Sequence, residues 1–152
     1  MPLKTTTLFK TGIQRKMMEE NVSLMKPLVL AYIGDSVYSV YVKKRIIEEI
    51  PGNVFKLHLK TCEYVKAAAQ AETVKYLWDD LSENEQNIVK RGRNAHSHTV
   101  PKNADVTDYR FATGFEALIG FLYLDGQNER LEEIMKKSYD HITDKEHKGE
   151  NE

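Results

Sequence analysis

The chain has 152 residues, with 22 Lys and Arg residues against 23 Asp and Glu residues, and one cysteine. This length fits a single domain that can bury a sizeable core, and the lone cysteine excludes both a disulfide framework and a cysteine-rich zinc site. The formal net charge of -1 argues at first sight against a nucleic acid partner, because proteins that bind phosphate usually carry an excess of basic residues.

The sequence predicts neither a targeting segment nor a membrane span. Residues 1–20 lack the apolar stretch that a signal peptide needs. The longest apolar runs, residues 27–42 and 111–124, are too short to cross a bilayer, and each contains an acid. We therefore expect a cytoplasmic protein with no membrane partner.

The first half of the chain has a helical pattern that prolines interrupt. Pro27 opens a long apolar segment that ends before Pro51 and Gly52. Asn53 is a candidate cap for the segment that follows. Residues 61–81 have apolar side chains at helical spacing and few β-branched residues, which predicts another helix there.

The second half continues this pattern around one irregular segment. Ser82 and Glu85 have the spacing of a capping box, which predicts the start of a helix. Residues 92–104 lack periodicity and contain Gly, Ser, Asn and Pro, so we expect a loop. A further helix is predicted for residues 107–124, with Gly126 as the terminating residue.

The C-terminal residues are the most polar part of the chain. Residues 129–142 have the pattern of a last amphipathic helix, and we expect the polar tail, residues 143–152, to be disordered. We expect residues 1–23 to form an N-terminal extension and residues 24–142 to form the folded domain. No alternating pattern typical of strands is present, so the predicted fold is an all-α bundle of about five to seven helices.

Two acids, Asp35 and Glu116, lie in segments where nearly every neighbour is apolar and no Lys or Arg falls within one helical turn. A helix that is apolar all round is a buried helix, so both carboxylates are expected to be buried. A buried unpaired carboxylate is strongly destabilising or takes up a proton. An Arg or Tyr from elsewhere in the fold is one solution for each acid. Two such acids favour a shared divalent cation, and ligation by oxygen alone suits Mg²⁺.

Two glycines accompany these acids. Gly34 and Gly120 lie inside the predicted helices, where glycine is unfavourable and often marks a close approach of two backbones. The two helices are therefore expected to cross closely where the acids meet, although ordinary packing of small residues is an alternative. The aromatic residues Tyr32, Tyr38, Tyr41 and Trp78 are expected to lie in the core rather than to act as stacking groups for bases.

A basic segment precedes the helix of Glu116. Residues 90–103, KRGRNAHSHTVPKN, contain no acid and no aromatic residue, so they suit the phosphates of a duplex better than stacked single-stranded bases. A solvated surface is the alternative. Residues 129–152 hold eight acids and five bases, which masks this segment in the net charge. The candidate RNA-binding residues are Lys90, Arg91, Arg93, Asn94, Lys102 and Asn103.

Two segments of the chain resemble the ribonuclease III family. LAYIGDSVYSVYV is similar to the signature helix of that family, and FEALIGFLYLDG is similar to its second motif. Their order, about eighty residues apart, is far more specific than either motif alone. Together with KRGRNAHSHTVPKN, these motifs resemble the small bacterial branch, Mini-ribonuclease III, which lacks the double-stranded RNA-binding domain. The resemblance covers about residues 24–142.

The resemblance implies a helical endonuclease domain of the ribonuclease III type. Asp35 matches the signature aspartate and Glu116 the catalytic glutamate, and the family uses both to bind catalytic Mg²⁺, for which Mn²⁺ can substitute. The two signature glutamates fall on Leu28 and Ala31, and a further acid of the family falls on Thr113. The number of metal ions that the site holds therefore stays open.

The resemblance also implies partners. It implies a symmetric homodimer that cuts both strands of double-stranded RNA, with the stem of precursor 23S ribosomal RNA as substrate and a large-subunit ribosomal protein as helper. Without a separate RNA-binding domain, the RNA contacts fall to the nuclease domain. The alternatives are a non-catalytic RNA- or ribosome-binding helical module, and a helical interaction protein whose acids are satisfied internally.

Overall fold

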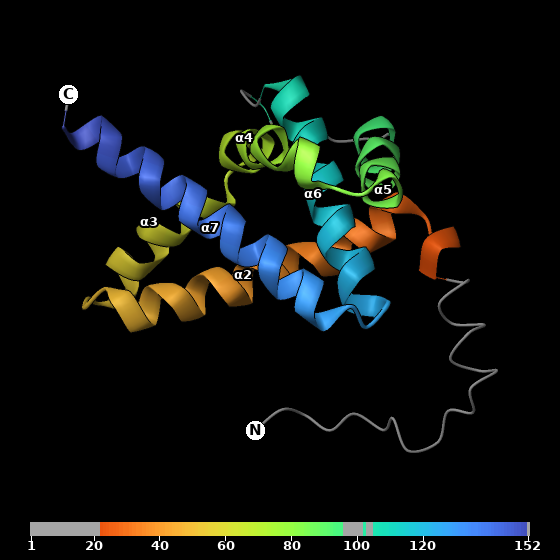
Figure 1. Ribbon diagram of the computed structural model, residues 1–152. Helices are drawn as coiled ribbons and strands as arrows, with labels where there is room; N and C mark the ends of the chain where they lie inside the picture. Colours follow the sequence, from red (N-terminus) through yellow and green to blue (C-terminus); the bar gives the residue numbers. More distant parts are fainter. Residues whose placement is uncertain (1–21, 96–101, 103–104, 152) are drawn as a thin grey trace, which may run out of the picture.

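Helix α6 (Val106–Leu124) runs through the middle of the structure, and α2, α4, α5 and α7 pack against it (Figure 1). The computed structural model describes residues 22–95, 102 and 105–151. Every regular element in these ranges is helical, which confirms the predicted all-α fold. The other elements are α2 (Pro27–Glu49), α3 (Val54–Val65), α4 (Ala67–Leu77), the short 3₁₀ helix η2 (Trp78–Asp80), α5 (Glu83–Asn94) and α7 (Asn128–Glu150).

The long segment that Pro27 opens forms helix α2, as predicted, and ends at Glu49 ahead of Pro51. One side of this helix belongs to the core, because α6 and α3 pack against it. The buried residues recur at about one helical turn, as expected for a helix with one buried face. They are Leu30, Ala31, Gly34, Tyr38, Val42 and Ile46.

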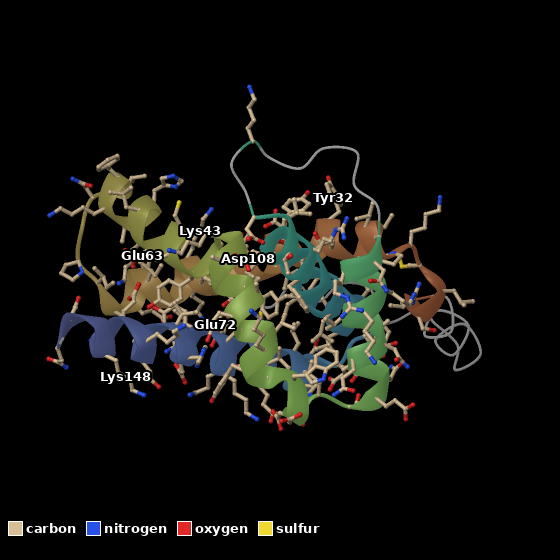
Figure 2. The ribbon with its side chains drawn as sticks, turned by 90° about the horizontal axis from the view of Figure 1, so that it is seen from above. Tyr32, Lys43, Glu63, Glu72, Asp108 and Lys148 are labelled. Atoms are coloured by element: carbon tan, nitrogen blue, oxygen red, sulfur yellow. The ribbon has the colours of Figure 1, made fainter. Side chains whose placement is uncertain are left out.

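The other side of α2 is exposed, so the expectation of a helix buried all round is wrong. Tyr32 is 81% exposed and Val40 is 67% exposed, whereas the predicted core position of Tyr38 is confirmed. In Figure 2 Tyr32 lies at the edge of the molecule opposite to α7. The apolar pattern alone did not reveal this face, because an apolar side chain has the same pattern whether or not another element covers it.

The helix predicted for residues 61–81 is interrupted at Lys66. This residue has an extended backbone, with φ of -60° and ψ of 151°, and separates α3 from α4. The interruption lets α3 pack against α2 while α4 packs against α6 and α7, which one straight helix does not allow. No Gly or Pro marks the break, so tertiary packing overrides a locally helical pattern here.

Both predicted N-terminal caps are present. The side chain of Asn53 accepts a hydrogen bond of 3.0 Å from the backbone N–H of Lys56. Ser82 and Glu85 form the full capping box, with bonds of 3.1 and 2.9 Å between each side chain and the other residue's backbone N–H. Helix α5 continues to Asn94, two residues beyond the predicted loop start, and most of that loop lies outside the described residues.

Helix α7 extends to Glu150, so the expectation of disorder is wrong for residues 143–150. Ion pairs hold this part of the helix against other helices. The Nζ atom of Lys60 lies 2.7 Å from the Glu146 carboxylate, and that of Lys145 lies 3.1 Å from the Glu72 carboxylate. These ion pairs join residues that are far apart in sequence. A prediction of disorder from the polar composition of residues 143–152 cannot take such contacts into account. The division into an extension, a domain and a tail otherwise stays a prediction.

Two pairs of glycines place α6 in direct contact with its neighbours. A Cβ atom at Gly34 of α2 would collide with the Glu116 carbonyl oxygen, and one at Gly120 would collide with the Leu30 carbonyl oxygen. At a second crossing, a Cβ atom at Gly92 of α5 would lie 2.8 Å from the Gly114 Cα atom of α6. The predicted close crossing of the helices that carry the acids is therefore confirmed.

Replacing Gly34 with alanine should lower the free energy of unfolding by about 3 kcal/mol, because overpacking outweighs the better helix propensity of alanine. Gly149 is the matched control, since it lies in α7 and a Cβ atom added there would meet no atom within 4 Å. Gly149→Ala should leave stability unchanged or slightly higher. Urea unfolding of both variants measures this difference, and equal stabilities would contradict the close crossing.

Candidate active site

The crossing of α2 and α6 brings Asp35 and Glu116 to the same place. Asp35 directly follows Gly34, which lies against the backbone of Glu116. The two carboxylates are close enough that, in addition to burial, the negative charge of Asp35 raises the pKa of Glu116. The two acids that the sequence singled out are therefore neighbours in space, although one comes from each of two distant helices.

The two carboxylates differ in exposure, so the expectation that both are buried is wrong for one of them. Asp35 is exposed, whereas Glu116 is only partly accessible. Asp35 is exposed because the packing of α6 and α3 leaves that side of α2 uncovered. One face of the site is consequently open to a large ligand.

Burial raises the pKa of Glu116 to about 8, and the nearby Asp35 carboxylate adds to this effect. A carboxyl group with this pKa is mostly protonated at neutral pH unless a cation lies beside it. Neither acid forms an ion pair or hydrogen bond with another residue in the described ranges. In contrast, the buried Glu85 carboxylate accepts bonds of 2.8 and 3.0 Å from Arg130.

The alternative in which an Arg or Tyr satisfies each acid therefore has no support in the part of the chain that the structure describes. Residues 22–95, 102 and 105–151 also contain no group of three or more His, Cys, Asp or Glu side chains that could hold a metal ion. Two carboxylates with an open face fit the coordination of Mg²⁺, which keeps several waters and uses one or two protein carboxylates together with substrate phosphate.

The positions where the resemblance expects further acids serve other purposes. Leu28 is partly exposed on α2 and Ala31 is buried in the core. The Thr113 hydroxyl donates a hydrogen bond of 3.0 Å to the Tyr109 carbonyl oxygen within α6. These three positions therefore add no carboxylate to Asp35 and Glu116.

The predicted RNA-binding residues occupy different surroundings at the end of α5. Lys90 is exposed, and its Nζ atom lies 5.7 Å from the centre of the Trp78 ring. Arg93 donates a 3.2 Å hydrogen bond to its neighbour Asn94. Lys102 is exposed, and Asn103 lies outside the described residues.

Arg91 differs from this group. Its guanidinium donates hydrogen bonds of 2.7 and 3.0 Å to the carbonyl oxygens of Ser23 and Met25, just before α2. The sequence does not reveal this contact, because Arg91 and its partners are separated by more than sixty residues. No local pattern marks an arginine that binds a distant backbone.

Comparison with known proteins decides the family. Residues 28–127 match the ribonuclease III domain family, and they include both acids and both glycine crossings. The chain belongs to the ribonuclease III family. The Mini-ribonuclease 3 of Thermoanaerobacter sp. is 53% identical over 120 residues, which cover 79% of this chain and 84% of that protein. The Mini-ribonuclease 3 of Staphylococcus aureus is 44% identical over 121 residues, which cover 78% and 90%.

A solved structure agrees with this assignment. The crystal structure of a Fusobacterium nucleatum protein matches with a TM-score of 0.67 and 30% sequence identity, and the match covers 73% of this chain and 88% of that one. The predicted resemblance to the small form of ribonuclease III is thus confirmed, and the chain is an endoribonuclease. Among the described helices, none combines the length and apolar character needed to cross a membrane.

The raised pKa of Glu116 predicts how stability changes with pH in the absence of metal ions. The folded protein keeps the Glu116 proton up to about pH 8, whereas the unfolded chain loses it near the ordinary value of 4.5. Between these values the folded state binds more protons, so the free energy of unfolding should fall as the pH rises. From about pH 5.5 to about pH 8 we expect a decrease of about 2 kcal/mol, discounted for partial solvent access.

Urea unfolding in EDTA at both pH values measures this decrease, with Glu116→Gln as the reference because its side chain does not titrate. The wild-type protein should lose more stability than the variant over this interval. Equal losses would show that Glu116 is already ionised in the metal-free protein.

Proposed function

We propose that this endoribonuclease requires Mg²⁺, with Mn²⁺ as a substitute, and cleaves double-stranded RNA at a site formed by Asp35 and Glu116. The observation that carries the proposal is the pair of uncompensated carboxylates at the crossing of α2 and α6. No described residue neutralises them, and their donor atoms and open face suit a hard divalent cation. A buried acid with a strongly raised pKa is also typical of functional sites.

In this proposal each acid has a separate part. Glu116 loses its proton when the cation binds, because the positive charge offsets both its burial and its repulsion from Asp35. Asp35 holds the cation from the exposed side of α2, where a duplex can approach. When bound, the cation supplies an activated water and stabilises the negative charge that develops on the scissile phosphate.

We further propose that Lys90, Arg93, Asn94, Lys102 and Asn103 contact the RNA backbone. Lys90 and Lys102 are exposed and form no ion pair within the described residues, so their charges are available to phosphates. Contacts of this kind sense the A-form shape and the 2′-hydroxyls of a duplex more than its bases. The sequence predicts Arg91 for this group as well, but its hydrogen bonds to the Ser23 and Met25 carbonyl oxygens favour a different role.

The exposed apolar face of α2 supports a homodimer. Leu28, Val29, Tyr32 and Val40 are all at least 39% exposed, on the helix that also carries Asp35. Exposed apolar side chains grouped on one helix often mark a protein interface, and a symmetric dimer that leaves Asp35 accessible to RNA would cover these side chains in both copies at once. Two copies would also supply two catalytic centres, one for each strand of the duplex.

For the physiological substrate, the support is the resemblance to the family alone. We propose that the enzyme matures precursor 23S ribosomal RNA in the cytoplasm, with a large-subunit ribosomal protein as helper. The near balance of acidic and basic residues supports the need for a helper, because a protein with little net charge binds RNA weakly in general. Cleavage of a purified precursor stem, with and without ribosomal proteins, tests this proposal.

Asp35→Asn and Glu116→Gln should each reduce cleavage of a perfectly paired RNA by at least about a thousandfold, because each removes one charge from the cation site. Binding of the duplex in EDTA should stay within about threefold of the wild type, since phosphate contacts made elsewhere supply most of the affinity. Gel assays of cleavage with Mg²⁺ and of binding with EDTA measure both effects. Glu129→Gln in α7 is the control, and it should cut normally.

Normal cleavage by either active-site variant would show that the acid is not catalytic. Binding of the duplex without cleavage by the wild-type protein would favour a non-catalytic RNA-binding module. The absence of both binding and cleavage would favour a helical interaction protein.

Tyr32→Lys should weaken dimerisation by about thirtyfold or more, because it places like charges in an apolar interface centre. Val54 of α3 is the control, since it is 82% exposed and lies outside the apolar face of α2. Sedimentation velocity across a range of concentrations should show a dimer for the wild type and for Val54→Lys. A dimer that survives Tyr32→Lys would place the interface elsewhere.

A further inference from the structure

Arg91 holds the segment that precedes α2. Its Nη1 atom donates to the Ser23 carbonyl oxygen at 2.7 Å, and its Nη2 atom donates to the Met25 carbonyl oxygen at 3.0 Å. Residues 22–24 are helical, and Ser23 and Met25 both present their carbonyl oxygens to the Arg91 guanidinium. A guanidinium suits this position, because its planar fork can donate to two acceptors and its charge complements the helix dipole.

The segment that Arg91 holds is already docked on the core. Val22 is buried with 6% exposure, and Met25 packs against the same core from a half-buried position. The Met25 backbone N–H also donates a 3.2 Å hydrogen bond to the Val22 carbonyl oxygen. Arg91 therefore bonds to an ordered stretch of backbone.

The other end of this contact is the last turn of α5. The residue after Arg91 is Gly92, which forms the close crossing with Gly114 of α6. Immediately beyond Gly92 are Arg93 and Asn94, which belong, like Arg91, to the basic segment of residues 90–103. The Arg91 guanidinium thus ties the turn that carries proposed RNA contacts to a fixed point near the start of α2.

Arg93 provides an internal comparison, because it lies in the same turn and carries the same group. Its Nε atom donates only to the adjacent Asn94 side chain, and its guanidinium carbon lies 5.7 Å from the centre of the Phe111 ring. It forms no hydrogen bond with a distant backbone in the described part of the chain. Its guanidinium can therefore turn toward a phosphate without releasing another segment.

We propose that Arg91 is a positioning residue for RNA binding and does not contact phosphate itself. This role rests on the proposed function, since it assumes that the end of α5 binds the duplex. Movement of Arg91 to a phosphate would break both of its hydrogen bonds to the Ser23 and Met25 carbonyl oxygens. Arg91 fixes the last turn of α5 before RNA binds. It therefore reduces the conformational entropy that this turn would otherwise lose on binding.

The test compares Arg91→Lys and Arg91→Gln with Arg93→Lys and Arg93→Gln. Lysine keeps the charge but loses the planar fork, so it separates a phosphate contact from the contact with two carbonyl groups. Three quantities are measured: amide exchange of residues 22–26 without RNA, binding of a short perfectly paired RNA in EDTA over a range of salt, and steady-state cleavage with Mg²⁺.

For both Arg91 variants we expect exchange of residues 22–26 to rise by about tenfold, the factor that corresponds to one hydrogen bond of a charged group. The KM for the duplex should rise with kcat unchanged within about twofold, and the salt dependence of binding should keep its slope. Arg93→Gln should instead lower that slope by about one, and Arg93→Lys should bind nearly as the wild type does.

The inference would be overturned if Arg91→Lys bound the duplex as tightly as the wild type and the binding by Arg91→Gln depended less steeply on salt concentration. Those two results together would show that Arg91 contacts phosphate. Unchanged exchange of residues 22–26 in Arg91→Lys would also overturn it. A wild-type protein that does not bind the duplex would overturn the proposed function together with the RNA-related part of this inference. The exchange measurement needs no RNA. It therefore tests the hydrogen bonds of Arg91 to Ser23 and Met25 even if the protein does not bind the duplex.

Discussion

The contact between the backbones of α2 and α6 is the constraint on which the rest of the structure depends. Gly34 and Gly120 each face a backbone carbonyl group of the other helix, so neither position tolerates a side chain. This approach sets Asp35 of α2 beside Glu116 of α6 without any direct bond between them. A second glycine pair, Gly92 and Gly114, brings α5 against α6 in the same way. The central helix is thereby held from two sides, and the elements proposed to cut and to bind RNA are both fixed to it.

Electrostatics divide the molecule in a way that the net charge of -1 does not reveal. The charges on α7 are largely paired, as in Lys136 with Asp140 at 2.6 Å and Lys137 with Asp80 at 2.6 Å. At the crossing of α2 and α6, by contrast, two acids have no basic partner among the described residues. The exposed Lys90 and Lys102 have no acidic partner there either. Total charge therefore describes solubility, whereas the distribution of unpaired groups indicates where a cation and a polyanion would bind.

The hydrogen bonds of Arg91 illustrate why a basic residue in sequence is not automatically a phosphate contact. Arg91 and Arg93 are two residues apart in the same run of bases, yet one binds a distant backbone and the other binds its neighbour. The two arginines differ in their partners because their side chains leave α5 in different directions. Arg91 meets the backbone of Ser23 and Met25, whereas Arg93 meets the Asn94 side chain. The same reasoning applies to Tyr32 and Tyr38, of which one is exposed and the other buried on a single apolar helix.

The sequence by itself determined the helical fold class and both caps at Asn53 and Ser82, because these depend on the spacing of neighbouring residues. It also determined the pair of acids with their glycines, because an unpaired acid or a glycine inside an apolar helix is destabilising unless it has a function or allows a close contact. The sequence also contained the family motifs, which the comparisons confirmed. Only the tertiary structure decided the break at Lys66, the helical continuation of α7 and the exposure of Asp35. These features depend on contacts between residues far apart in the chain, and a pattern of neighbouring residues carries no information about which side of a helix another element will cover.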